Sequence, residues 1–181
     1  MQNHPLEKIL NASAWDILTA IEKGFRAQVD VKGKLAELFM DRQLTALEKA
    51  GTIQTHVWQD IDGKPDFIVT YKGRELALEC KNIRNETYKR PPAFKVELQK
   101  TRNSKDGTPT RGYRIDEFDV LGVALFNQTG RWDYLYIATK RLERRPELAD
   151  LLKVMQRVPM DAESLGDWRT GPIEAFDDAL L

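Results

Sequence analysis

The sequence predicts an α/β or α+β fold in which helices flank a mixed central sheet. Three observations support this class. Apolar residues recur at helical spacing in the N-terminal part, short apolar runs bounded by turn residues follow them, and 181 residues suit one domain. The order of helices, strands, a strand pair and a final helix favours one domain with one core.

Two helices are expected in the N-terminal part of the chain. Ser13 is a candidate N-cap for a short amphipathic helix that ends at Gly24. A second helix is expected from Asp30 to Ala50, with Asp30 as its N-cap and Gly51 beyond its end. The stripe expected to be buried on this helix consists of Leu35, Leu38, Phe39, Leu44 and Leu47.

Short extended runs predict the strands that follow the second helix. They cover residues 52–58, 66–71, 74–81, 94–98, 118–126 and 132–139. The turn sequences Asp62–Pro65 and Lys72–Gly73 make the first three of these strands a meander. Asn103–Gly112 is expected to be a loop, and Pro146–Val158 is expected to be a helix with proline in its first turn.

Composition limits the class of protein. With 41% hydrophobic and 31% charged residues, the chain is predicted to be neither disordered nor membrane-spanning. The amino terminus lacks a secretory signal and Cys80 is the single cysteine, which favours a reducing, cytoplasmic setting. No glycine-rich phosphate loop is visible, which argues against a nucleotide cofactor. We divide the chain into a helical extension, a core, and a C-terminal helix with an acidic, solvated tail, at residues 1–29, 30–140 and 141–181.

Charge is segregated although the chain is neutral overall, with 28 basic and 28 acidic residues. Ten basic and three acidic residues lie between Lys81 and Arg114, which gives this segment a net charge of +7. Tyr88 and Tyr113 are among the aromatic residues interleaved with these charges, as is typical of contact with a phosphate backbone. A solvated, lysine-rich surface is the alternative, and charge alone does not decide between the two.

The hairpin around Lys72–Gly73 has a register that the sequence specifies. Symmetric pairing about this turn places Phe67 opposite Leu78 and produces one continuous apolar face, which a slip of one residue would destroy. The same register places Asp66 opposite Glu79 on the other face, with Cβ atoms about 5 Å apart. Two carboxylates are therefore expected to face each other.

Lys81 lies two residues after Glu79 and shares its face, whereas Cys80 points to the apolar side. Three explanations compete for this cluster. The first is a surface ion pair worth about 1 kcal/mol at most. The second is a site for a divalent cation, beside which the amine orients or deprotonates water or balances charge on phosphorus. The third is a glycosidase acid pair. The glycosidase explanation leaves the lysine and the basic segment without a role.

The pattern resembles the PD-(D/E)xK signature of the restriction-endonuclease-like nuclease superfamily. Pro65-Asp66, twelve intervening residues and Glu79-Cys80-Lys81 carry the likeness, together with the preceding helix. The resemblance implies an αβββαβ core with a mixed sheet. It also implies Mg²⁺-dependent hydrolysis of DNA phosphodiester bonds, with Mn²⁺ as a substitute metal.

The resemblance further implies roles for individual residues. Asp66 and Glu79 match the metal-binding acids, which the backbone carbonyl of Cys80 often joins, and Lys81 matches the catalytic lysine. Glu37 is similar to a catalytic glutamate that many members carry on the preceding helix, although an exposed helix residue would look the same. Charge alone selects the expected DNA contacts, which are Lys100, Arg102, Arg111 and Arg114.

The sequence departs from the family pattern at the crossover helix between the third and fourth core strands. Residues 82–117 do not show this helix clearly, although a parallel fourth strand requires a crossover. Either Ala93–Arg102 is helical despite its alternating pattern, or a short turn near Arg114–Glu117 serves instead.

We therefore expect a Mg²⁺-dependent DNA endonuclease of the restriction type that acts on double-stranded DNA. A homodimer is expected, because cutting both strands at one site calls for two active centres. A structure-specific repair or recombination nuclease and a catalytically silent DNA-binding module are the alternatives. Association with a membrane is not expected.

Overall fold

The computed structural model describes residues 4–100 and 112–181. The chain divides into two compact units, with the boundary between Leu35 and Ala36. The helices of the N-terminal part are α1 (Pro5–Leu10), α2 (Ala14–Lys23) and α3 (Phe25–Lys49), the last of which crosses this boundary. Among the described helices, none is both long and apolar enough to cross a bilayer.

Gly24 separates α2 from α3. Ser13 caps α2, because its Oγ accepts a hydrogen bond from the backbone N–H of Asp16 at 3.1 Å. Gly24 ends α2 with an extended backbone, and its carbonyl accepts the first backbone hydrogen bond of α3. The expected helix between Ser13 and Gly24 is confirmed. The predicted N-cap at Asp30 is wrong, because the chain resumes a helix directly after Gly24 and Asp30 lies inside it.

Seven strands of the described residues form one mixed sheet. They are β1 (Thr55–Trp58), β2 (Phe67–Tyr71), β3 (Arg74–Lys89), β4 (Pro92–Glu97), β5 (Val120–Ala124), β6 (Tyr134–Ala138) and β9 (Met155–Val158). The first three are the expected antiparallel meander, β5 runs parallel to β3, and β6 runs antiparallel to β5. The predicted fold class, with a mixed sheet flanked by helices, is confirmed.

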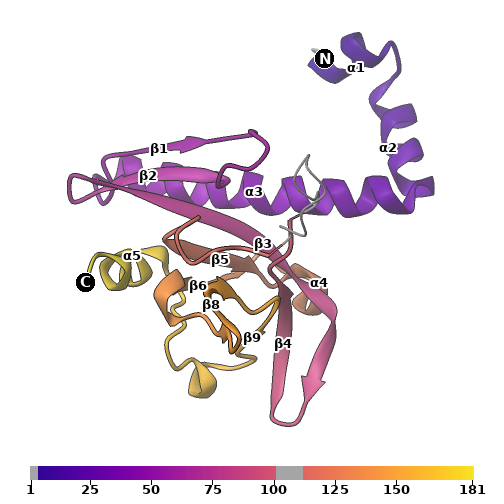
Figure 1. Ribbon diagram of the computed structural model, residues 1–181. Helices are drawn as coiled ribbons and strands as arrows, with labels where there is room; N and C mark the ends of the chain where they lie inside the picture. Colours follow the sequence, from indigo (N-terminus) through magenta and orange to yellow (C-terminus); the bar gives the residue numbers. More distant parts are fainter. Residues whose placement is uncertain (1–3, 101–111) are drawn as a thin grey trace. The chain divides into compact units, whose positions relative to one another are not determined.

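Strand β3 has different neighbours along its length (Figure 1). Its first part, as far as Asn82, pairs with β2 and β5, whereas the part from Ile83 onward pairs with β4, which in turn pairs with β9. Because residues 92–97 form a strand, the helical alternative for Ala93–Arg102 is wrong over its described part. The chain turns at Ile115–Asp116 ahead of β5, and the alternative that this turn serves in place of the crossover helix stays a prediction. The loop predicted at Asn103–Gly112 lies outside the described residues except for its last position.

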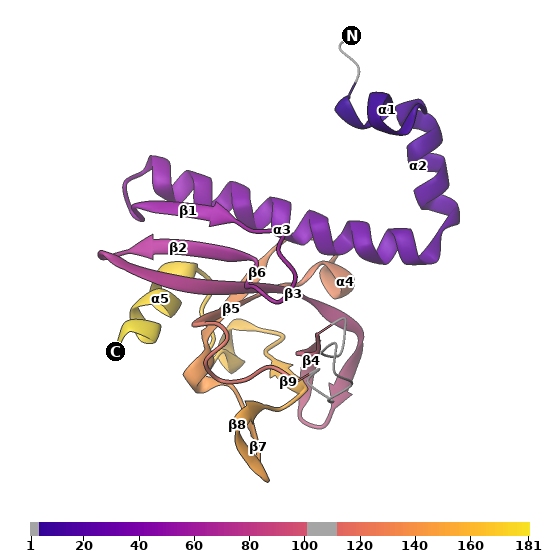
Figure 2. The same ribbon diagram turned by 45° about the horizontal axis from the view of Figure 1, so that its top comes forward.

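Two apolar layers cover the two faces of the central strands. On one face, Met40 and Leu44 of α3 pack with Phe176 of helix α5 (Pro172–Leu180) against β2, β3, β5 and β6, and Figure 2 shows α5 and the C-terminal part of α3 beside these strands. Of the stripe expected on α3, Leu44 is fully buried and Phe39 and Leu47 are partly buried. On the other face, β4, β9 and the segments around them enclose a second core.

The C-terminal region differs most from the prediction. In place of a helix at 146–158, the chain forms β7 (Arg144–Arg145), β8 (Leu148–Leu152) and β9. Gln156 of β9 is 2% exposed, and its amide donates to the carbonyl of Glu143 at 2.8 Å and accepts from the N–H of Glu143 at 3.0 Å. This contact and the pairing with β4 hold the segment extended. The remaining short helical segments are α4 (Phe126–Thr129), Thr139–Arg141 and Ala162–Ser164.

The acidic tail was expected to be solvated, and this expectation is wrong. Its last residues form α5, in which Ala175 and Phe176 are fully buried. Asp178 of the same helix is largely buried and binds the guanidinium of Arg141 at 3.1 and 3.2 Å. The tail is therefore part of the packed structure.

Candidate active site

The hairpin between β2 and β3 has the register that the sequence predicts. Phe67 lies opposite Leu78, and every other pair of the hairpin follows the same register as far as the turn. Lys72 and Gly73 have positive φ values of 50° and 74°, which a tight two-residue turn of this type requires. Asp66 precedes Phe67 and Glu79 follows Leu78. The two acids therefore come to the same end of the hairpin.

Asp66 is fixed by the backbone of β3. Its Oδ2 accepts a hydrogen bond from the backbone N–H of Cys80 at 2.8 Å. The side chain of Cys80 packs in the core that includes Met40 of α3 and is 6% exposed, so it points away from the acids as predicted. The Asp66 carboxylate is half-buried. It is therefore held against the strand that carries the other acid.

Glu79 is the most deeply buried acid of the cluster, with 3% exposure. Its Oε1 accepts hydrogen bonds from the Nζ of Lys81 and from the hydroxyl of Tyr113. A buried carboxylate without such partners would be costly, so the two donors make this position tenable. The side chain of Lys81 remains 25% exposed. The structure thus brings Asp66, Glu79 and Lys81 together.

Tyr113 is a member of the site that sequence reasoning did not identify. Its hydroxyl binds Glu79, and its ring lies 5.5 Å from the Nζ of Lys81 and 5.4 Å from the Nζ of Lys100. The residue is buried and its ring packs edge-on against Phe118. Tyr113 and Glu79 are far apart in the sequence, so no local pattern could have linked them.

The electrostatics of the cluster separate an acid from a cation. Burial, followed by the charge of Glu79, raises the pKa of Asp66 from its ordinary value of 3.8 to about 7, although Lys81 acts in the opposite direction. Burial acts to lower the pKa of Lys81, but the charges of Glu79, Tyr113 and Asp66 outweigh it and raise that pKa well above its usual range. Lys81 is therefore an ammonium ion at neutral pH.

Glu37 approaches the cluster from α3. Its Oε2 accepts a hydrogen bond from the Nε1 of Trp58 at 2.9 Å, and the ring of Trp58 stacks on Phe67 with 6.0 Å between centroids. The charge of Glu37 contributes the smallest of the effects that raise the pKa of Asp66. Glu37 is thus near the two acids, and its catalytic role stays a prediction.

The residues expected to contact DNA are arranged less favourably. Lys100 forms an ion pair with Glu117. Arg114 binds Asp116 at 3.1 Å and Asp150 at 2.8 Å. These carboxylates compete with a phosphate for the same cations. The other two expected contacts, Arg102 and Arg111, lie outside the described residues.

The acids fit part of the coordination shell of a magnesium ion. Among the described residues, no group of three or more His, Cys, Asp or Glu side chains could hold a metal ion unaided. Mg²⁺, however, is commonly bound through one or two carboxylates while waters and substrate phosphates complete its shell. Asp66 and Glu79 provide two carboxylates of that kind, and the part expected of the Cys80 carbonyl stays a prediction. Burial, followed by the charge of Glu79, raises the pKa of Asp66, and a cation bound by both carboxylates would offset the effect of Glu79.

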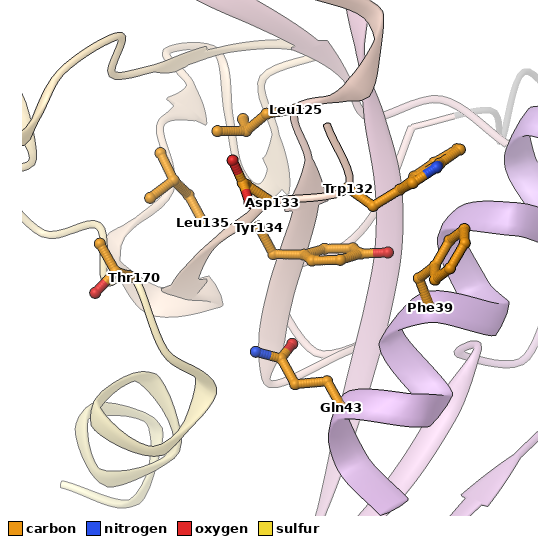
Figure 3. A pocket seen from close by; sticks show the side chains of 8 residues that line it. All are labelled: Phe39, Gln43, Leu125, Trp132, Asp133, Tyr134, Leu135 and Thr170. Atoms are coloured by element: carbon orange, nitrogen blue, oxygen red, sulfur yellow. The ribbon is translucent and has the colours of Figure 1, made fainter. Parts of the chain in front are cut away.

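A separate hollow of about 580 Å³ lies between α3 and β6. Figure 3 shows Phe39, Trp132 and Tyr134 around it. Its one acid, Asp133, is paired with Arg131 at 2.8 Å. The lining includes no residue of the acidic cluster, and β5 lies between β6 and β3. This hollow is therefore not the candidate active site.

Comparison with known proteins identifies one similar architecture. The structure resembles that of a bacterial homing endonuclease, I-Ssp6803I, with a TM-score of 0.53 and 12% sequence identity. The match covers 83% of this chain and 95% of the endonuclease chain. No family model matches the sequence, and no curated protein matches it. The similarity is one of fold.

Proposed function

We propose that this protein is a Mg²⁺-dependent endonuclease of the PD-(D/E)xK type that cuts double-stranded DNA in the manner of a restriction enzyme. The observation that carries the proposal is the convergence of Asp66, Glu79 and Lys81 at the end of one hairpin. The fold similarity to a homing endonuclease supports the same class of reaction. A purely structural ion pair would need no second acid beside Glu79, and that acid raises the electrostatic cost of the site.

In this proposal, Asp66, Glu79 and the carbonyl of Cys80 hold the cation. When bound, Mg²⁺ neutralises phosphate charge and favours the ionised form of a bound water. Water adds to phosphorus, one phosphorus–oxygen ester bond breaks, and the departing oxygen takes up a proton. Lys81 is a fixed cation, so its role is to orient the water and to stabilise the negative charge that grows on the phosphate oxygens. Glu37 completes the outer shell of the site.

We also propose a homodimer, in which two copies supply the two centres that double-strand cleavage requires. Helices α1 and α2 bury none of their own residues. The N-terminal unit, which ends at Leu35, has three strongly exposed apolar side chains: Ile9 at 73%, Trp15 at 77% and Phe25 at 79%. In the proposed dimer these side chains would be covered in one contiguous apolar patch, which is typical of an association surface. Light scattering of the intact protein tests this assembly.

The central experiment compares plasmid cleavage by the wild type, Asp66→Ala and Lys81→Ala, each with Mg²⁺ and with a chelator. We expect discrete fragments from the wild type with Mg²⁺ only. The rate should fall by about 10³-fold or more in both variants, because each substitution removes charge stabilisation from the transition state. Lys49→Ala, at the exposed end of α3, is the matched control and should cleave like the wild type. Equal cleavage by all four proteins would refute the proposal.

A further inference from the structure

The outer part of β3 forms an antiparallel arm with β4 and β9 (Figure 1). One face of this arm is apolar: Ile83, Val96 and Val158 are buried in the second core. Side chains alternate between the faces of a strand, so the residues between these positions lie on the opposite face. Lys95 of β4 and Arg157 of β9 lie directly opposite each other on that face.

Two like charges in directly opposed positions destabilise a pair of strands. Here an aromatic ring offsets part of that cost. The Nζ of Lys95 lies 4.8 Å from the centroid of the Tyr88 ring, and the Cζ of Arg157 lies 4.3 Å from it. Both contacts are attractive, because the face of an aromatic ring carries partial negative charge. Tyr88 therefore holds two cations side by side at the surface.

Within the described residues, Lys95 and Arg157 take part in no ion pair. The guanidinium of Arg157 donates a hydrogen bond to the backbone carbonyl of Pro91, and the charge of Lys95 acts weakly on the carboxylate of Glu86. Lys89 and Arg90, at the tip of the hairpin, likewise form no ion pair with any carboxylate of residues 4–100 and 112–181. The two acids of the arm, Glu86 and Glu97, are both bound by Arg84. We call the surface made by Tyr88, Lys95 and Arg157 the basic face; Lys89 and Arg90 lie beside it at the tip of the hairpin.

We propose that the basic face binds the phosphate backbone of double-stranded DNA. The inference rests on the proposed function, because that function supplies DNA as the partner. The negative charge of duplex phosphates would remove the repulsion between Lys95 and Arg157, and each cation can contact a phosphate. The ring of Tyr88 is engaged by the two cations, so it positions them and does not stack on a base. The face therefore contributes affinity and orientation for DNA of any sequence.

The experiment measures binding of a fluorescent duplex by anisotropy, with a chelator present and at several salt concentrations. Lys95→Gln/Arg157→Gln is compared with the wild type and with Lys49→Gln/Arg74→Gln. The control variant removes the same charge from exposed positions at the end of α3 and at the opposite end of β3. Loss of two phosphate contacts should make the plot of log K against log salt less steep by about 1.8. The dissociation constant at about 0.1 M salt should rise by about tenfold, with little change in the control.

Folding is checked by thermal unfolding, and a second variant keeps the test independent of Tyr88 packing. Lys89→Gln/Arg90→Gln lies at the exposed tip and should weaken binding in the same way. If both arm variants bind DNA with the constants and salt slope of the control, the basic face is refuted. Tighter binding of polyglutamate than of duplex would also refute it and would indicate an acidic protein partner.

The cleavage assay tests the proposed function separately from the basic face. Both arm variants retain Asp66, Glu79 and Lys81, so each should still cleave plasmid with Mg²⁺ at saturating protein concentration. Cleavage with unchanged DNA binding would refute the basic face alone. Lost binding in the arm variants, with no cleavage by any of the proteins, would refute the nuclease and leave the basic face as a DNA-binding surface. A wild type that binds no duplex would refute both.

Discussion

The two parts of strand β3 carry the same kind of charge in opposite ways. In the inner part, Lys81 is mostly buried and is bound to Glu79. In the outer part, the cations around Tyr88 are at the surface and form no ion pair within the described chain. A cation held by a buried acid has a fixed position and is suited to act on a reacting group. A cation that forms no ion pair keeps its charge available for an anion. In our proposals, the inner part of β3 belongs to a chemical site, whereas its outer part, with Lys95 of β4 and Arg157 of β9, belongs to a binding surface.

The largest effects on cleavage and stability are expected from substitution of Asp66, in the inner site. Asp66→Asn keeps an oxygen that can accept the hydrogen bond from Cys80 but removes one of the two opposed charges. Cleavage should fall by about 10³-fold or more, as expected when a cation ligand loses its charge. The metal-free variant should nevertheless be more stable than the wild type at pH 8, by about 2–4 kcal/mol. Urea unfolding in the presence of a chelator measures this difference.

The effect of Asp66→Asn on stability should depend on pH. The pKa of Asp66 is raised in the folded state to about 7, so folding favours the protonated form. The stability that this residue contributes is complete below its unfolded pKa and is lost as the pH rises through about 7. The gain from Asp66→Asn should therefore be small at pH 4 and largest at pH 8. Mg²⁺ should raise the melting temperature of the wild type at pH 8 and leave that of the variant unchanged. A gain that is independent of pH would contradict this account.

A smaller effect is expected from Tyr113→Phe, which removes a donor from Glu79 without changing any charge. Stability should fall by about 1–2 kcal/mol, because a buried acceptor loses one partner. Cleavage should fall by about tenfold in kcat with little change in KM, because the acid and Lys81 are less well oriented. Tyr134→Phe is the matched control. It removes a buried hydroxyl that donates to the carbonyl of Ala36 in the other core, at 2.6 Å.

Tyr134→Phe should lose a similar amount of stability and keep its cleavage rate. If the two variants lose activity equally, Tyr113 has only a structural role. A change in the Mg²⁺ concentration needed for half-maximal stabilisation in Tyr113→Phe, and not in Tyr134→Phe, would link Tyr113 to the acids independently of turnover.

The contrast between the two parts of β3 also explains what the sequence could predict. Asp66 and Glu79 could be paired because a tight turn and a matched apolar face fix the register within a few residues. Tyr113 could not be assigned to Glu79, because their contact depends on how distant segments pack. The same is true of Arg114, whose partner Asp150 is far along the chain. Local pattern predicts a hairpin, but not which of the surrounding cations will be neutralised.

The helix predicted at 146–158 shows the same limit for the backbone. Its apolar spacing suits a helix, but β9 is selected by the exposed edge of β4, which lies about sixty residues earlier in the sequence. The same pairing is required by the DNA-binding surface that we propose, because β9 brings Arg157 beside Lys95. An error in one element therefore concealed the surface that we propose for DNA binding.

The smallest effect is expected at Glu37, which tests how far the inner site extends onto α3. Glu37→Gln keeps an acceptor for the indole N–H of Trp58 and removes only the charge that acts on Asp66. Because this charge has the weakest of the influences on Asp66, cleavage should fall by about threefold, which corresponds to less than 1 kcal/mol. Glu37→Ala also leaves the indole without its acceptor and should be the more affected of the two. Single-turnover cleavage measures both variants. A loss in Glu37→Gln as large as that in Asp66→Ala would mean that Glu37 binds the cation directly, and the site would then comprise three acids.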